Sequence, residues 1–322
     1  MSIRSMGSRA RRRWPLLMLL ALLATGVMAA CGGGDDDGGA TTGTGVKVVA
    51  TTTQIGALTR EVAGDEVELT VLLTAGADAH DYEPSPKAVA QIKNAQVVLV
   101  NGIGLDEWLD DVISGAGAAR VVVVTDGIAI RESDDEQGDD EENAHDEGDP
   151  HVWHDPMNAK VMVDNIVAAL SKADPERAAT FRANGDAYKA KLDDVDAQIR
   201  ELINTIPAEN RKVVTNHDAF GYFFDRYGLE LVGAIIPSTS KEAQPSAKDL
   251  ADLTNLIKRE GVKAIFAEEE VDPKVARQLA ADTGVAIETG LYADSLGAPG
   301  SGAETVDGML LSNATKIAEA LR

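Results

Sequence analysis

One long amphipathic pattern in the middle of the chain, from about Asp174 to Thr205, constrains the fold more than any other feature. Its large apolar residues recur at spacings of seven, four, three, four and three: Phe181, Tyr188, Leu192, Val195, Ile199 and Leu202. These spacings place the side chains on one face of a helix about 45 Å long. Gly185 weakens such a helix by about 1 kcal/mol, so two shorter helices with a break near this residue are the alternative. A single helix would connect the two halves of the chain stiffly.

Short runs rich in β-branched residues alternate with turn signals and helical stretches on both sides of this pattern. We expect strands at Val46–Ala50, Val67–Leu73, Gln96–Val100, Arg120–Thr125, Arg211–Thr215, Leu231–Ile236, Lys263–Ala267 and Ala286–Thr289. Helices are expected at Lys87–Asn94, capped by Ser85 and begun by Pro86, and at Ala247–Arg259 and Pro273–Thr283. Strands that alternate with helices imply a parallel sheet in each half.

The length of the chain favours two lobes, because about 275 residues from Val46 onward exceed what one core usually organises. We therefore expect an α/β fold in which each lobe has a parallel sheet flanked by helices. The first lobe would span residues 46–173 and the second residues 206–322, with one helix at 174–205 between them.

The first 30 residues have the features of an export signal. They contain five arginines and no acidic residue, and the apolar run Trp14–Met28 is too short to span a bilayer comfortably. The segment Val27–Cys31 resembles the lipobox of bacterial lipoproteins, in which the cysteine is lipidated. An ordinary cleaved signal peptide is the alternative. We expect an extracytoplasmic protein anchored to the cell membrane through a lipid on Cys31.

Residues 31–45 are expected to form a flexible tether, because after Cys31 they contain only Gly, Asp, Ala and Thr and cannot bury a core. Such a segment reaches roughly 20 Å. Cys31 is the only cysteine of the chain, which excludes an intrachain disulfide bond and any thiolate cluster.

The charge of the chain argues against a nucleic-acid partner. The formal net charge is −23, and it becomes −28 without residues 1–30, because 25 basic residues then face 53 acidic ones. So acidic a protein repels the phosphates of nucleic acids.

Residues 131–149 include eleven Asp or Glu and no apolar residue larger than Ala144, which predicts a mobile acidic loop. The simplest interpretation is that this loop keeps the protein soluble. The alternative is that the loop binds cations weakly, with His145 as an accessory metal ligand.

Four potential metal ligands lie far apart, each in a loop-like segment: His80, His151, His217 and Asp294. Open α/β sheets place ligand residues outside the carboxyl ends of their strands. Three neutral imidazoles and one carboxylate complete a tetrahedral set for a first-row divalent ion and leave no position for a substrate water. Such a set indicates capture of the ion rather than catalysis.

Several neighbours of these ligands are secondary candidates. His154 follows His151 by three residues and could be an accessory metal ligand or an orienting residue, with a capping or surface role as the plain alternative. Acidic neighbours of the histidines that could orient the imidazole rings are Asp81, Asp155 and Asp218.

The ligand segments carry recognisable motifs. They are Asp78-Ala79-His80-Asp81-Tyr82, Asp149-Pro150-His151-Val152-Trp153, His217-Asp218-Ala219-Phe220-Gly221-Tyr222 and Tyr292-Ala293-Asp294-Ser295. Together with the long helix, they resemble the zinc- and manganese-binding receptors of bacterial ABC importers over essentially Val46 to Arg322. In that family a rigid helix joins two α/β lobes and the metal lies between them. The resemblance implies that His80 and His151 come from the first lobe, and His217 and Asp294 from the second.

The same resemblance bears on the metal. Manganese-selective members often carry a carboxylate where this chain has His217, so Zn²⁺ is expected and Mn²⁺ is the alternative. Two residues depart from the family pattern: Ala79 replaces the usual proline, and His154 replaces a common leucine.

A receptor of this kind implies an ABC permease and its ATPase as partners and a monomer with no enzymatic activity. A zinc hydrolase would need an open coordination position and a base such as Glu83, and the chain has no His-Glu-x-x-His pair. A second alternative is a metal-dependent adhesion or storage lipoprotein in which the acidic loop binds the metal. A related receptor for siderophores or vitamin B12 would not need the histidines.

Overall fold

The computed structural model describes residues 45–80, 82–109, 112, 120–132, 148–236 and 245–322. The expected export signal, Cys31, nearly all of the tether, Asp81 and most of the acidic loop with His145 lie outside these residues. Gly43–Arg322 form one compact unit. Within the described ranges, every helix is too short or too polar to cross a membrane.

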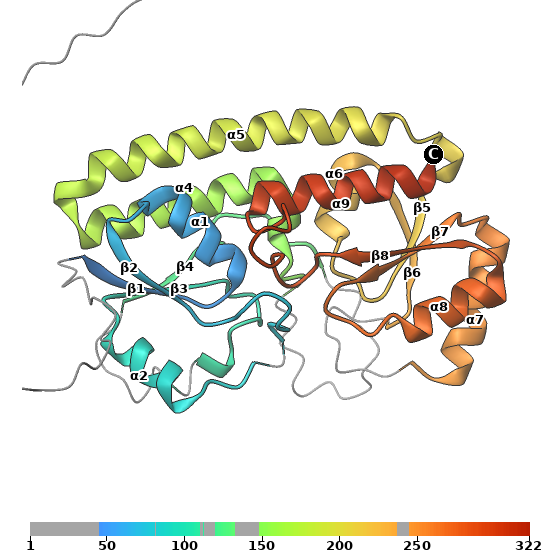
Figure 1. The fold of residues 1–322 in the computed structure, drawn as a ribbon, viewed down its shortest axis with the longest axis horizontal. Coiled ribbons are helices and arrows are strands. Elements are labelled where there is room, and N and C mark those ends of the chain that lie inside the picture. The colour runs from blue at the N-terminus through green and yellow to red at the C-terminus, as the bar shows by residue number, and fades with distance from the viewer. Residues whose placement is uncertain (1–44, 81, 110–111, 113–119, 133–147, 237–244) are drawn as a thin grey trace, which may run out of the picture. The chain divides into compact units, whose positions relative to one another are not determined.

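Each half of this unit contains a four-stranded parallel sheet (Figure 1). The first sheet has the order β2-β1-β3-β4 and the second the order β6-β5-β7-β8. The strands are β1 (Val46–Ala50), β2 (Val67–Val71), β3 (Val97–Val100), β4 (Arg120–Val123), β5 (Lys212–Thr215), β6 (Glu230–Ala234), β7 (Ala264–Glu268) and β8 (Ala286–Leu291). Because the strands of each sheet are parallel, their carboxyl ends lie at one edge, which is where such sheets bind ligands.

The helices lie on both faces of the sheets, as Figure 1 shows. They are α1 (Thr53–Ala63), α2 (Pro86–Asn94), α4 (Pro156–Ala173), α5 (Ala178–Asn204), α6 (Gly221–Tyr227), α7 (Ala247–Glu260), α8 (Lys274–Thr283) and α9 (Val306–Leu321). Side-chain caps set several helix starts. The Ser85 side chain accepts a hydrogen bond from the Ala88 amide, as predicted, and Ser246 forms a capping box with Asp249.

The long connecting helix is continuous. A short 3-10 turn, Pro175–Arg177, precedes α5, which then runs without a break through Gly185. A Cβ atom at Gly185 would lie 2.6 Å from Val167 Cγ2 and 3.4 Å from Val163 Cγ1, both on α4. The glycine that weakens the helix in isolation therefore permits close packing of α4 against α5. The prediction of a single helix between two α/β lobes is confirmed.

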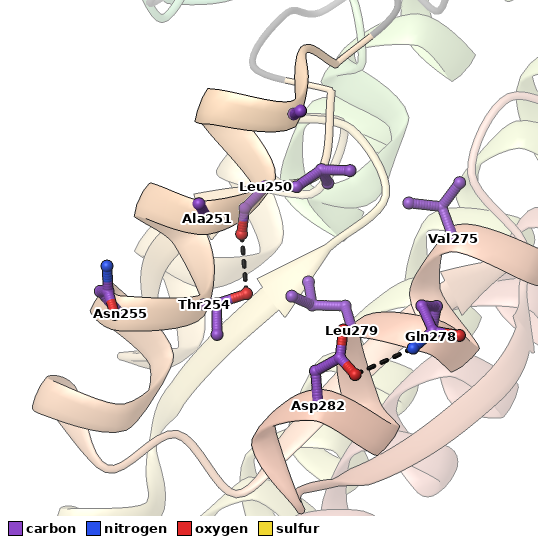
Figure 2. Close-up of a pocket in the computed structure, with 9 residues that line it drawn as sticks. Leu250, Ala251, Thr254, Asn255, Val275, Gln278, Leu279 and Asp282 are labelled. Carbon is purple, nitrogen blue, oxygen red and sulfur yellow. Dashed lines mark hydrogen bonds between the residues drawn. The ribbon is translucent and has the colours of Figure 1, made fainter.

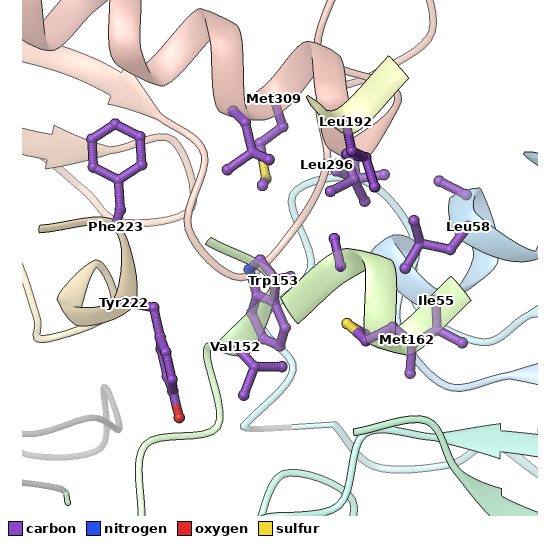
Figure 3. Close-up of a cluster of buried hydrophobic side chains, with 14 of the residues drawn as sticks. Ile55, Leu58, Val152, Trp153, Met162, Leu192, Tyr222, Phe223, Leu296 and Met309 are labelled. Carbon is purple, nitrogen blue, oxygen red and sulfur yellow. The ribbon is translucent and has the colours of Figure 1, made fainter. Parts of the chain in front are cut away.

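The main hydrophobic core extends through both lobes. Trp153, which is fully buried, lies among Val152, Leu296 and Met309 in Figure 3. Its indole N–H donates to the Ala293 carbonyl of the second lobe over 3.0 Å. Two smaller cores pack under α2 and under α7 and α8, on the other faces of the sheets. Helix α9 packs along α5 and also contacts α1 and α4, so the last helix joins a helical layer shared by both lobes.

A leucine at position 185 is expected to separate α4 from α5. Because its side chain would enter occupied space, Gly185→Leu should lower the free energy of unfolding by about 1–3 kcal/mol. The measurement is chemical denaturation, with Ala187→Leu on the exposed face of α5 as the matched control. The control should change stability by less than about 0.5 kcal/mol. Equal effects of the two substitutions would contradict the packing role of Gly185.

Candidate metal centre

Four side chains from distant segments converge where the two lobes meet. His80, His151, His217 and Asp294 each offer one ligand atom, and these atoms all lie within 4.8 Å of one another. The Nε2 atoms of His80 and His151 are 3.2 Å apart, and His151 Nε2 lies 3.1 Å from Asp294 Oδ1. A tetrahedral ion with metal–nitrogen bonds of about 2.0–2.1 Å holds its ligand atoms about 3.3 Å apart. The cluster is therefore close to the size of a divalent-metal site.

Asp149 aligns the imidazole of His151. Its Oδ1 accepts from the His151 backbone N–H over 3.0 Å and lies 2.8 Å from the ring Nδ1. This contact places a proton on Nδ1 and directs Nε2 toward the cluster, as carboxylate partners of metal-binding histidines do. Asp149 is itself buried, so its orientation is fixed by its surroundings.

Glu268 holds His217 in the same way from the end of β7. Its Oε1 accepts from the His217 backbone N–H over 3.1 Å, and its Oε2 lies 2.7 Å from the ring Nδ1. Strand β7 lies beside β5, which ends at Thr215, two residues before His217, so sheet pairing brings Glu268 and His217 together. His217 Nε2 then faces Asp294 Oδ2 at 3.7 Å.

The metal-free centre favours protonated imidazoles at two positions. Burial works against the charged form of His151, but Asp149 and Asp294 outweigh it and raise its pKa to about 9. Burial likewise opposes the charge on His217, yet Glu268 and Asp294 raise its pKa to about 10. Each ring can then donate one proton to its orienting carboxylate and the other toward Asp294. A metal ion would replace the protons that point at Asp294.

His80 differs from the other members of the cluster. Burial lowers its pKa to about 4 against the opposing effect of Asp294, so its ring is neutral at pH 7. Its side chain is 11% exposed, whereas those of His151, His217 and Asp294 have no exposed surface. Asp78 accepts from the His80 backbone N–H over 2.9 Å and shapes the turn that presents the ring. His80 is therefore the member of the cluster that is in contact with solvent.

His154 is outside the cluster of four. It is fully buried, and its ring packs against Phe220, with ring centroids 4.7 Å apart, and against Trp153 at 5.9 Å. Burial lowers its pKa to about 3, so the ring is neutral. His154 therefore fills an aromatic core position beside the centre.

The orienting carboxylates of His151 and His217 differ from the candidates chosen by sequence adjacency. Asp155 instead caps α4 and pairs with Arg226, and Asp218 lies buried between β5 and α6. Asp149 could have been found as the first residue of the Asp-Pro-His motif. Glu268 had a weaker signal, since it ends a strand at the edge of the sheet where ligands gather.

A groove of about 450 Å³ between α7 and α8 is separate from this centre (Figure 2). It is lined mainly by apolar and uncharged side chains, including Leu250, Thr254 and Leu279, and Asp282 is the one charged residue among them. A single carboxylate cannot hold a divalent ion by itself. The groove shares no residue with the four-residue cluster.

The chain resembles known proteins both in sequence and in fold. Residues 48–320 match the family described as ZnuA, zinc-uptake complex component A, periplasmic. The solved structure of the periplasmic zinc-binding protein TroA from Treponema pallidum superposes with a TM-score of 0.76 and 32% identity. That match covers 85% of this chain and 98% of the TroA chain.

Two relatives are named for metals other than zinc. The manganese-binding lipoprotein MntA of Halalkalibacterium halodurans is 31% identical over 274 residues, which cover 84% of this chain and 87% of MntA. The iron-binding protein YfeA of Yersinia pestis is 32% identical over 253 residues, which cover 78% of each chain. Relatives of similar identity thus differ in the metal for which they are named.

Metal binding is expected to release about two protons per ion at pH 7. The pKa values of about 9 and 10 mean that His151 and His217 are both protonated there before the ion enters. Because protons compete with the metal, affinity should rise with pH, by up to about 100-fold per pH unit below both pKa values. Calorimetric titration in buffers of different ionisation enthalpy measures the released protons. Heats that do not depend on the buffer would contradict this exchange.

Proposed function

This chain belongs to the ZnuA family of periplasmic zinc-uptake components, and from this premise we propose that it is an extracytoplasmic receptor that captures Zn²⁺ and delivers it to an ABC permease. His80 and His151 would bind the ion from the first lobe, and His217 and Asp294 from the second. The ion is the transported substrate, so the centre must bind it tightly and also release it.

The observation that carries this proposal is the convergence of three imidazoles and one carboxylate from four separate segments. All four ligand positions of a tetrahedral ion would be filled by protein atoms, with no position left for a reacting water. The family consists of transport receptors rather than enzymes, and the chain is accordingly not an enzyme.

The choice of Zn²⁺ rests on the chemistry of the donors. Imidazole suits zinc, and the general affinity order of divalent ions places Zn²⁺ above Mn²⁺. Mn²⁺ is the second candidate, because MntA is named for manganese at 31% identity to this chain. A bidentate Asp294 would raise the coordination number and favour that ion.

The transport role implies a membrane permease and a cytoplasmic ATPase as partners, since relatives are named as lipoproteins of metal ABC transporters. We also propose that Cys31 carries a lipid and that residues 31–45 tether the folded unit to the membrane as a monomer. Mass spectrometry of the mature protein from cells would detect the lipid.

Calorimetric titration of the metal-stripped protein with Zn²⁺ and with Mn²⁺ tests the metal. We expect one tight zinc site, weaker manganese binding and a loss of at least about 100-fold in zinc affinity for His217→Ala, because the set of four loses one ligand. Asp252→Asn on the exposed surface of α7 is the control and should bind as the unaltered protein does.

The possible outcomes are distinct. Tight manganese with weak zinc would keep the receptor role and change the ion. Tight binding that persists in His217→Ala would move the site to other residues. No tight binding of either ion would contradict the proposed function.

A further inference from the structure

Arg131 connects the two lobes beside the candidate metal centre. It follows β4 of the first lobe, and its guanidinium Nη1 donates to Asp149 Oδ2 over 2.9 Å. Its Nε donates to Asp225 Oδ2 on α6 of the second lobe over 2.7 Å. The planar guanidinium thus holds one carboxylate from each lobe at the same time, which the single ammonium of a lysine does less well.

The first of these carboxylates belongs to the residue that aligns His151. Asp149 Oδ1 contacts His151 while Oδ2 contacts Arg131, so both oxygens are engaged. The Asp149 backbone N–H also donates to the Arg131 carbonyl over 2.9 Å. Gly148, with φ of +84°, makes this approach possible, because a Cβ atom there would lie 2.5 Å from that carbonyl oxygen. Arg131 and Asp149 are therefore joined through both their side chains and their backbones.

The second lobe is shaped to receive the arginine. A Cβ atom at Gly221 would lie 1.7 Å from Arg131 Nη1, so a larger residue there would displace the guanidinium from this position. The Tyr222 hydroxyl accepts from the Arg131 backbone N–H over 3.0 Å and donates to the Asp149 carbonyl over 2.8 Å. The Arg131 Cζ atom also lies 5.7 Å from the centre of the Tyr222 ring. These contacts explain the Gly-Tyr pair that follows His217 in the sequence motif.

We propose that Arg131 is an interlobe positioning residue that holds His151 in its metal-binding orientation by bonding to both Asp149 and Asp225. This inference rests on the proposed function. When the lobes are together, Arg131 fixes Asp149 and Asp149 fixes the His151 ring. Separation of α6 from the first lobe breaks the bond to Asp225 and releases one side of this support. Arg131 thereby couples the contact between the lobes to the retention of the ion.

The contact of Arg131 with Asp149 differs from an ordinary surface ion pair. The Asp149 side chain is 1% exposed and that of Arg131 is 29% exposed, so their charge-assisted hydrogen bond is shielded from water. Asp225 is 67% exposed, and its removal should leave the core intact. This difference in exposure allows the two halves of the coupling to be tested separately.

The test compares Arg131→Ala and Asp225→Asn with Asp252→Asn as the matched control. Zinc-loaded full-length protein is mixed with an excess of a chromogenic chelator. The absorbance of the zinc–chelator complex then gives the rate at which the protein releases zinc. Loss of partners that orient metal ligands typically weakens binding by about 10–100-fold, so Arg131→Ala should release zinc at least about tenfold faster. Asp225→Asn should accelerate release by about threefold or more, while Asp252→Asn should have no effect.

A second measurement tests the contact of Arg131 with Asp149 and Asp225 in the absence of metal. Hydrogen exchange of the metal-free proteins should be faster at residues 149–154 and 221–227 in Arg131→Ala and in Asp225→Asn, and unchanged in the control. A general loss of structure would instead accelerate exchange across both lobes, including β1 and β7.

The outcomes separate this inference from the proposed function. Faster release in Arg131→Ala alone would show that Arg131 acts only within the first lobe and would overturn the interlobe coupling. Tight zinc binding in all variants, with unchanged release and exchange, would overturn the inference and keep the receptor function. If the unaltered protein binds neither zinc nor manganese tightly, the receptor function fails. Localised faster exchange in both variants would then still support the contact, and unchanged exchange would overturn it.

Discussion

The close approach of three imidazoles and one carboxylate, of which only His80 is partly exposed, is the constraint on which the meeting of the two lobes depends. Ionisable groups without access to water are costly unless charged partners and hydrogen bonds compensate. Asp294 of the second lobe lies 3.1 Å from His151 of the first, and Asp149 and Glu268 satisfy the remaining ring nitrogens of His151 and His217. Each lobe by itself would leave part of this arrangement exposed and uncompensated.

The helical layer limits how far the lobes can separate. Helix α5 spans both halves without a break, and α9 packs along it while reaching α1 and α4 of the first lobe. Trp153 adds a buried contact with the Ala293 carbonyl, next to Asp294. A change between metal-bound and metal-free states is therefore expected to be a small adjustment at the centre rather than a wide opening of two domains.

The strands, the helices α2, α5, α7 and α8 and the four clustered residues could be predicted from local sequence signals, whereas the helices α1, α4, α6 and α9 were not predicted. The Ser85-Pro86 pair predicted the start of α2, and apolar spacing predicted α5, because both depend on neighbouring residues. Glu268 could not be predicted in the same way. It lies 51 residues from His217 and begins an acidic run, Glu268-Glu269-Glu270, which has the composition of a solvated surface. Only the pairing of β5 with β7 brings it to the histidine.

The exchange of protons for metal at Asp294 has a consequence for recognition. When a divalent ion replaces two protons on His151 and His217, the net charge of the centre does not change. The empty and loaded receptors then present nearly the same long-range electrostatic field to a membrane partner. The partner must therefore recognise the metal-loaded receptor by its shape and stiffness. The surfaces near the junction of the lobes are where these properties would differ between the empty and the loaded protein.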